Sequence, residues 1–470
     1  MTGAVVSMER RPLPPAPKAN PIFGTAWRFR RDPLRCLQEF VDEVGHAYRY
    51  RFFLNFWGYV FVHPEHNQQI LLDNYKNYTK SPHPTFDLLL PLLGRGLLSN
   101  DGESWLRQRR LVQPAFHRQQ IRSFASTMTA AAVRRFSRWE RAAREGKPVS
   151  FDREMMELTF EIAGRTLFSV DLKEETQEIG DILSQLNQLF INMAMEPFSL
   201  YTLKMPFLPR TRRIFRDIGT LDQLIYAMIA QRREAEDPGS DLMGMLLAAR
   251  DEETGLGMDE KQIRDEVLTL LIAGHETTAL LMTWLFYCLG CNPDVEAQLH
   301  DEVDRTLNGR VPTFEDIPNL VYTRQVVDET MRVYPPAYAL SRACNDADVV
   351  GGYAVQPNSV ITLSPYITHR LPEFWDDPDR FDPERFAPAM NAARHRFAYI
   401  PFGAGPRQCI GNGFALIEGV LLAAAIAQRF RLRIPEGYTA ELAPQITLHP
   451  KGGMPLQFEN RESSVVSRGS

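Results

Sequence analysis

The chain has 470 residues, of which 44% are hydrophobic and 24% charged, and its formal net charge is −5. This length and composition allow a large buried core, and the slightly acidic balance argues against a nucleic-acid-binding protein. Five cysteines at scattered positions indicate a reducing compartment and not a disulfide framework; they are Cys36, Cys288, Cys291, Cys344 and Cys409.

The first 50 residues predict an extended tail and the start of a small β region. Residues 1–20 are rich in proline, which favours the polyproline II conformation. Aromatic and β-branched residues at 47–52 and 58–62 flank a turn and predict a short hairpin. From Asn100 to about Leu340 the pattern is mostly helical.

A first motif lies on the helix predicted around Trp105. Trp105 and Arg109 are four residues apart, so they share one helix face. Without further context this would be an amphipathic helix with its arginine in solvent.

The second motif, Ala273-Gly274-His275-Glu276-Thr277-Thr278, lies in a long apolar helix predicted from Asp259 to Gly290. Asp259 can cap this helix, and Thr277 and Thr278 can donate to carbonyls one turn earlier. Gly274 indicates the close approach of another group or a local distortion of the helix. Because His275 and Glu276 are ionisable, the stretch is not expected to cross a membrane. No targeting segment is visible, so we expect a cytoplasmic protein.

Two further pairs lie downstream. Cys288 and Cys291 end the long helix and are interpreted as structural thiols, because no partner pair or preceding strand accompanies them. Glu329 and Arg332 are three residues apart on one helix face, which predicts an ion pair. The segment Pro383-Glu384-Arg385-Phe386 adds a second arginine.

The C-terminal part returns to short elements. Residues 349–362 and 437–458 predict short strands, and 371–388 predict irregular structure because they are crowded with Pro, Asp and aromatic residues. No linker interrupts the interior. We therefore expect a single domain over residues 21–460, mainly α with a small β region, and a disordered tail at 461–470.

The most informative segment runs from Phe402 to Gly411 and reads Phe-Gly-Ala-Gly-Pro-Arg-Gln-Cys-Ile-Gly. It predicts a glycine-rich loop that delivers Cys409 to the start of a helix, where free N–H groups and the helix dipole stabilise a thiolate. Glycines remove side-chain bulk, so a large flat group could lie against this backbone. Such a thiolate is a plausible axial ligand for haem iron.

The pattern Phe402-x-x-Gly405-x-Arg407-x-Cys409-x-Gly411 resembles the haem-binding signature of the cytochrome P-450 family. The segment at 273–278 resembles the oxygen-activation motif of the same family, and the Glu329, Arg332 and Arg385 segments resemble its buried charge cluster. The resemblance covers nearly the whole chain, with the motifs in family order. It implies the cytochrome P-450 fold and haem b (iron protoporphyrin IX) as cofactor.

The resemblance also implies roles for single residues. Cys409 would ligate the iron, with Phe402 and Gly411 beside it. Trp105, Arg109 and Arg407 would hold the haem propionates, with Arg342 as a weaker candidate. Glu276 would be the acid and Thr277 the alcohol that handle protons at the oxygen-binding face, while Glu329, Arg332 and Arg385 would lock the scaffold behind the haem.

The implied reaction is a monooxygenation, the insertion of one oxygen atom from O2 into a lipophilic substrate such as a fatty acid or terpenoid. Two alternatives remain: a haem-thiolate enzyme that uses peroxide or rearranges its substrate, and a non-catalytic haem sensor. By family analogy the substrate pocket is lined by residues 86–93, 190–207, 271, 273, 337–340 and 445–447.

No flavin or iron–sulfur module is recognisable, so electrons are expected from a separate ferredoxin or flavodoxin with its reductase. A basic docking face for this partner would include Arg107, Arg110, Arg118, Arg394 and Arg396.

Overall fold

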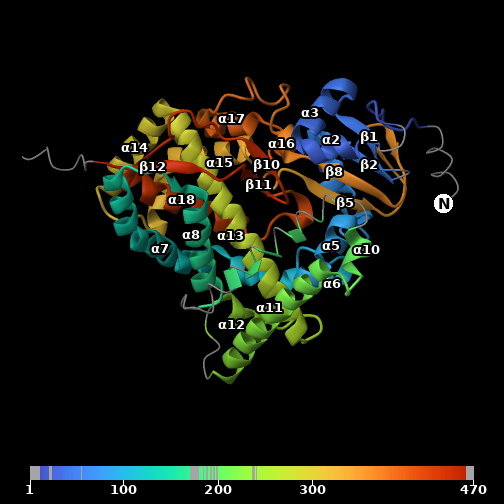
Figure 1. Ribbon diagram of the computed structural model, residues 1–470, viewed down its shortest axis with the longest axis horizontal. Helices are drawn as coiled ribbons and strands as arrows, with labels where there is room; N and C mark the ends of the chain where they lie inside the picture. Colours follow the sequence, from blue (N-terminus) through green and yellow to red (C-terminus); the bar gives the residue numbers. More distant parts are fainter. Residues whose placement is uncertain are drawn as a thin grey trace, which may run out of the picture.

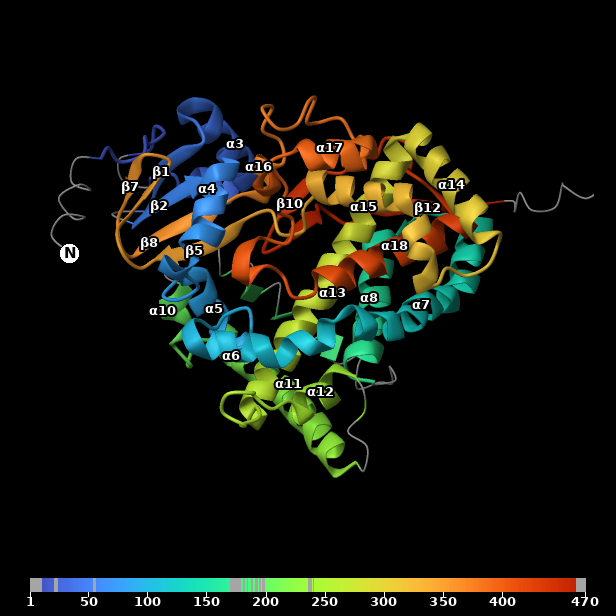
Figure 2. The same ribbon diagram turned by 180° about the vertical axis from the view of Figure 1, so that it is seen from behind.

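The computed structural model divides into a β-rich region at one side and a larger helical region at the other, with the long helix α13 between them (Figure 1). Figure 2 shows the same division from behind, with α4 at the sheet and α14 at the far side of the helical region. The structure describes residues 11–20, 24–53, 56–169, 179–180, 182–183, 185–186, 189–190, 193, 196, 199–235, 239 and 241–461.

The described helices account for most of the ordered chain, as the sequence predicts. They are α2 (Ala26–Arg31), α3 (Pro33–Val44), α4 (Pro64–Gln68), α5 (Pro84–Leu93), α6 (Gly102–Val112), α7 (Arg118–Glu145), α8 (Phe151–Leu167), α10 (Ser199–Leu203), α11 (Pro209–Glu234), α12 (Leu242–Ala248), α13 (Glu260–Cys291), α14 (Pro293–Leu307), α15 (Val321–Val333), α16 (Pro365–Thr368), α17 (Pro388–Ala393) and α18 (Asn412–Arg429). Short helical turns are η1 (Gln69–Asp73), η2 (Tyr75–Asn77), η3 (Gln113–Phe116), η4 (Phe314–Asn319), η5 (Pro383–Phe386), η6 (Arg396–Ala398) and η7 (Gly405–Arg407).

The strands form one five-stranded sheet and three smaller ones. In the large sheet the order is β1-β2-β8-β5-β3, and only the β2–β8 pair is parallel. The strands are β1 (Ala47–Phe53), β2 (Phe56–Phe61), β3 (Tyr78–Thr79), β4 (Val149–Ser150), β5 (Leu340–Cys344), β6 (Asp348–Val350), β7 (Tyr353–Val355), β8 (Ser359–Leu363), β9 (Phe430–Arg433), β10 (Leu442–Pro444), β11 (Leu448–Pro450) and β12 (Pro455–Asn460). The predicted hairpin is β1–β2, and the short strands predicted after residue 349 and after residue 437 are present.

The described part of the N-terminal tail is anchored to the β region. The carbonyl of Pro12 accepts a hydrogen bond from Ala354 N–H at 2.9 Å, and the carbonyl of Pro15 accepts one from Arg49 N–H at 2.9 Å. Pro14 and Pro17 are buried. The tail is therefore bound to the edge of the β region over residues 12–17, because proline carbonyls still accept hydrogen bonds. The predicted C-terminal tail lies outside the described residues, except for Arg461.

Helix α13 is the central element of the core. The Asp259 carboxylate accepts a hydrogen bond from Gln262 N–H at 2.7 Å, which caps the helix at the predicted place. The helix ends at Cys291, immediately before Asn292 and Pro293, and Pro293 starts α14. It is also the one described helix that is long and apolar enough to span a bilayer, and most of its apolar stretch is buried in the protein core.

Candidate functional site

The cysteine loop has the form that its glycines predict. Gly403 and Gly405 have positive φ angles of 66° and 69°, and a Cβ at Gly405 would overlap the carbonyl of Leu71. The loop closes when Cys409 N–H donates to the carbonyl of Phe402 at 3.0 Å. Gly411 is the N-cap of α18, so Cys409 lies two residues before the N-cap of this helix.

The Cys409 side chain is accessible, although protein surrounds it. Burial raises the pKa of this thiol above its ordinary value, while the Gly411 N–H and the charge of Arg109 act in the opposite direction. A side chain that is both accessible and desolvated faces an internal hollow and not open solvent. A cation bound at the sulfur would supply the charge needed to keep it as thiolate.

Helix α13 has a matching accessible window. Its residues are buried from Ile263 to Leu271 and from Thr278 to Leu289, but burial is interrupted at 272–275 and again at Thr277. Ala273 is exposed there, in the middle of the core helix. Such a window in a central helix indicates that α13 also faces an internal hollow.

Helix α18 brings the cysteine loop alongside this window. A Cβ at Gly419 on α18 would lie 3.2 Å from the side chain of Leu281, and the side chain of Thr278 interacts with the buried Glu418. Since α18 starts at Asn412, the loop before it lies about 9 Å further along the helix axis from that contact. The thiol and the α13 window therefore lie in the same part of the molecule.

The two threonines of α13 behave as predicted. Thr277 Oγ1 donates to the carbonyl of Ala273 at 2.8 Å, and Thr278 Oγ1 donates to the carbonyl of Gly274 at 3.2 Å. Among the described residues, no protein group approaches Gly274 closely. A Cβ there would have only the side chain of Leu167 near it, at 3.9 Å.

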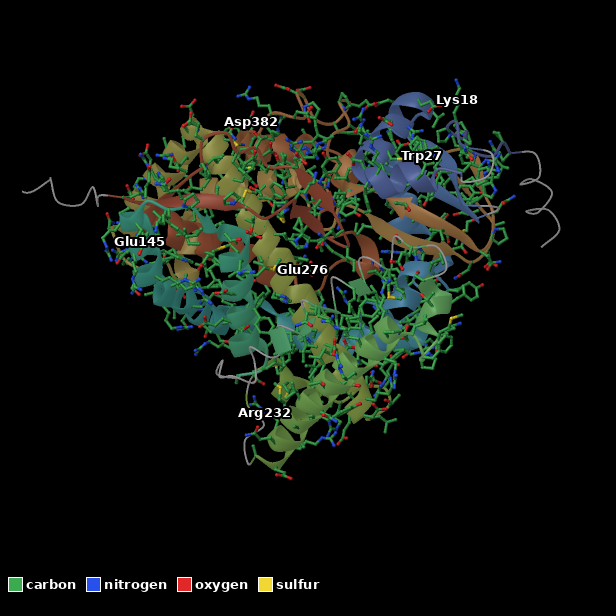
Figure 3. The ribbon with its side chains drawn as sticks, viewed as in Figure 1. Lys18, Trp27, Glu145, Arg232, Glu276 and Asp382 are labelled. Carbon is green, nitrogen blue, oxygen red and sulfur yellow. The ribbon has the colours of Figure 1, made fainter. Side chains whose placement is uncertain are left out.

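Glu276 has different hydrogen-bond partners from Thr277. Figure 3 places Glu276 on α13 near the centre of the molecule. Its Oε1 atom accepts from Thr447 Oγ1 at 2.7 Å and lies 2.9 Å from His449 Nε2. His449 and Thr447 lower the pKa of the Glu276 carboxyl, although its burial acts to raise it. Glu276 is therefore held as a carboxylate by β11 and the residue before it.

A group of buried cations lies at the other edge of the site. Arg342 on β5 is 5% exposed, and it donates a hydrogen bond to the adjacent carbonyl of Ser341 at 2.8 Å. Burial, followed by the charge of Arg407, lowers the pKa of Arg342 to about 10. Lys80 is 8% exposed, and burial lowers its pKa well below the ordinary value, with Arg342 and Arg407 adding to the effect. Asp101 is the carboxylate of this group and pairs with Arg407.

The tryptophan and the remaining arginine complete this edge. Trp105 is buried, and the guanidinium of Arg407 lies over its ring at 4.2 Å from the centroid. Arg109 lies 6.0 Å from the same centroid and donates to the carbonyl of Gln408 at 2.7 Å. Arg109 thus joins α6 directly to the residue before Cys409.

Comparison with known proteins decides the family. The family model for cytochrome P450 matches residues 14–456. The chain belongs to the cytochrome P450 family. Its relatives include cyclooctatin synthase of Streptomyces melanosporofaciens, which is 39% identical and aligned over 92% of this chain and 93% of the relative. Pentalenene oxygenase of Streptomyces avermitilis is 32% identical over 93% of this chain and 95% of the relative. The solved haem domain of cytochrome P450DA superposes with a TM-score of 0.88 at 27% identity, covering 97% of this chain and 99% of that domain.

Cytochrome P450 enzymes are monooxygenases that use haem ligated by a cysteine thiolate, and the described residues of this P450 fit that cofactor. Protoporphyrin carries two propionates. Among the described residues, this group has three cationic side chains, Lys80, Arg342 and Arg407, and one carboxylate, that of Asp101. A buried excess of two positive charges is costly by itself and is relieved by a dianion. The accessible thiol of Cys409 is the kind of ligand that the iron of such a cofactor would need.

Lys80, Thr447 and His449 were not foreseen from the sequence. Lysine is commonly a surface residue, so nothing set Lys80 apart from the other lysines of this P450. Thr447 was expected only as a pocket position, and His449 had no motif. Their connection with Glu276 spans more than 170 residues.

The predicted charge cluster of this P450 is assembled. Arg332 donates to both carboxylate oxygens of Glu329, at 2.7 and 2.8 Å, and Arg385 Nε lies 3.5 Å from the same carboxylate. Both Glu329 and Arg332 have no exposed surface. Arg332 also donates to the carbonyls of His369 and Pro378, which joins α15 to the irregular segment after α16.

The predicted docking arginines are partly engaged within the chain. Arg107 donates to the carbonyls of Leu256 and Gly257, and Arg110 pairs with Asp251. Arg394 stacks on a tryptophan ring at 3.9 Å. These side chains support loops of the P450 in addition to any role at its surface.

Proposed function

We propose that this P450 hydroxylates or epoxidises a cyclic terpenoid. The observation that carries the proposal is the accessible window around Ala273 on α13, beside the loop of Cys409. Both similar Streptomyces enzymes act on terpenoids, according to their names. The substrate would lie in this window, next to the haem.

The charge distribution of the pocket favours a neutral substrate over a fatty acid. A fatty-acid carboxylate needs a fixed cation for recognition. Among the described pocket positions the charged residues are Asp87, Glu196 and Lys204. Glu196 pairs with Arg210, while Asp87 and Lys204 lie at an outer pocket. Ile446, which is 39% exposed, adds apolar surface between Gln445 and Thr447.

An outer pocket supports a route for a lipophilic molecule. It has a volume of about 580 Å³, lies between α5, α10 and α11, and is lined mainly by apolar side chains. It includes neither Cys409 nor any residue of α13, so it is not the reaction site itself, and it is proposed as an outer approach to that site. Leu90, Leu203 and Phe215 provide apolar walls of this approach.

Cys409 is proposed as the axial ligand of haem b, with Phe402 and Gly411 shaping its loop. Trp105, Arg109, Arg342 and Arg407 are proposed to hold the propionates, together with Lys80. Bound haem iron supplies the activation of O2 and the transfer of one oxygen atom to the substrate.

The chain's own groups manage protons and exclude water. Thr277 Oγ1 stands at the accessible window and is proposed to hold a proton where O2 binds. Glu276, one residue before it, is proposed to replace that proton. The buried apolar surroundings of α13 keep water from diverting either step.

Electrons are proposed to come from a separate ferredoxin or flavodoxin with its reductase, in the cytoplasm. A peroxide-using enzyme would need no such partner. Product formation with NADPH, a ferredoxin and its reductase, but not with peroxide alone, would support the monooxygenase reaction with separate electron donors.

The substrate class is tested by absorbance titration of the purified haem protein. A cyclic diterpene or sesquiterpene should shift the Soret band at micromolar concentration, and a linear fatty acid of similar carbon number should not. A fatty acid that shifts the band while cyclic terpenes have no effect would overturn the terpenoid proposal.

A further inference from the structure

The steps proposed above do not explain how Glu276 regains a proton after it has passed one on. Its residue is 7% exposed, so after it passes a proton toward Thr277 it cannot recover one directly from bulk water. Its neighbour His275 points its ring Nδ1 at the carbonyl of Leu271, at 2.8 Å, and acts on Glu276 only through charge. The group that must supply the proton therefore lies on another element.

His449 is a titratable group in hydrogen-bond contact with this carboxylate. Its Nε2 atom lies 2.9 Å from Glu276 Oε1 and 3.0 Å from Thr447 Oγ1, and Thr447 itself donates to Glu276. The Thr447 hydroxyl has one proton, which it donates to Glu276, and a carboxylate has none to donate. The two contacts of Nε2 are therefore hydrogen bonds when Nε2 carries a proton. The imidazole thus already holds a proton 2.9 Å from the acid that needs it.

Exposure rises step by step along this segment. Thr447 is 8% exposed, the His449 side chain is 20% exposed and the Lys451 side chain is 67% exposed. Alternate residues of an extended strand share one side, so Thr447 and His449 lie together between the buried carboxylate and solvent, and Lys451 lies in the turn beyond β11. Imidazole can take up a proton at one ring nitrogen while releasing one at the other.

We propose that His449 is the residue through which protons from solvent reach Glu276. His449 Nε2–H gives its proton to Glu276 Oε1, and Nδ1 takes up a proton that solvent delivers as hydronium. The ring stays neutral, the Glu276 carboxylate becomes a carboxylic acid, and proton exchange of the ring with solvent restores Nε2–H. This inference rests on the proposed proton-handling role of Glu276 and Thr277.

The test compares His449→Gln, His449→Phe, Glu276→Gln and Lys451→Gln in the haem-loaded protein with its redox partners, using any substrate that shifts the Soret band. Glutamine keeps an amide donor near the position of Nε2 but cannot relay a proton. Both His449 variants should bind substrate within about twofold of the wild type. They should form at least threefold less product per NADPH, with more hydrogen peroxide and a larger solvent deuterium isotope effect. Lys451→Gln changes the local charge without touching Glu276 and should match the wild type.

A spectroscopic measurement tests the contact independently of turnover. In infrared spectra of the reduced carbon monoxide complex, the carboxylate band lost in Glu276→Gln identifies Glu276. That band should shift in His449→Phe and stay in place in Lys451→Gln.

The outcomes distinguish the role of Glu276 from the role of His449. Glu276→Gln with wild-type product per NADPH would overturn the role of Glu276 itself, and His449 with it. An uncoupled Glu276→Gln beside a fully coupled His449→Gln would overturn only the relay, since a donor without proton transfer would then suffice. If His449→Phe fails to fold, His449→Gln decides the matter alone.

Discussion

Replacement of Arg342 by methionine should affect the haem-free and the haem-loaded protein in opposite directions. Methionine has a similar length and no charge. In the fold without haem, Arg342 is a buried guanidinium whose pKa falls from 12.5 to about 10, first through burial and then through Arg407. One pKa unit corresponds to about 1.4 kcal/mol, so the charge costs the haem-free fold about 3 kcal/mol at neutral pH.

A propionate beside Arg342 reverses this effect. A charge-assisted hydrogen bond of this kind contributes about 1.5–3 kcal/mol. Arg342→Met should therefore speed haem loss about 10- to 150-fold, while the haem-free protein becomes more resistant to urea by up to about 3 kcal/mol.

Two assays measure the two opposite effects, on haem loss and on the stability of the haem-free protein. Transfer of haem to an excess of a haem-scavenging globin, followed by absorbance, gives the rate of haem loss. Urea unfolding of the haem-free protein, followed by tryptophan fluorescence, gives its stability. Arg35→Met is a matched control, because the Arg35 side chain is 76% exposed and pairs with Glu39 at the surface. If the Arg342→Met protein loses haem at the wild-type rate and its haem-free form is less stable than the wild type, Arg342 is a structural residue and not a propionate ligand.

Three further substitutions test the site and its scaffold. Cys409→Ser should abolish the red-shifted Soret band that the reduced carbon monoxide complex shows with thiolate ligation, and a retained band would disprove the assignment. Arg332→Lys keeps the charge but loses the paired bonds to Glu329 and bonds to carbonyls, so urea unfolding should show a loss of about 3 kcal/mol or more; an unchanged midpoint would contradict a structural role. Burial raises the pKa of Glu266 from 4.5 to about 8, so between these values the native state holds a proton that the unfolded state has lost. The native protein should therefore lose stability as pH rises from about 4.5 to 8, Glu266→Gln should show a smaller loss in melting temperature over this range, and identical profiles would refute the shift.

The proton path and the haem cradle share one physical feature. In both, a buried charged group is proposed to meet a partner that only the loaded, working enzyme supplies: a propionate for Arg342, and a moving proton for Glu276. Burial makes these groups strongly dependent on their partners. For the same reason, substitutions there should change haem retention and coupling more than substrate affinity.

Local patterns along the chain were enough to predict most elements of the fold. Asp259 caps α13 because a carboxylate before an apolar helix accepts the free N–H groups of its first turn. The back-bonding of Thr277 and the exposed place of Cys409 before α18 also follow from neighbours within a few residues. Trp105 and Arg109 share a face because of helical spacing alone. The family resemblance then supplied the cofactor, for which the glycine-rich loop before Cys409 was the local indication.

Tertiary structure decided which distant side chains meet. Glu276 turns to Thr447 and His449, across more than 170 residues, and Lys80 comes to lie with Arg342, across more than 260. Neither pairing has a periodicity or a spacing in the sequence, because it depends on how β5 and β11 pack beside the central helices. The pKa shifts of these groups come from burial, and burial is a property of the whole packed molecule, which a single stretch of sequence does not contain.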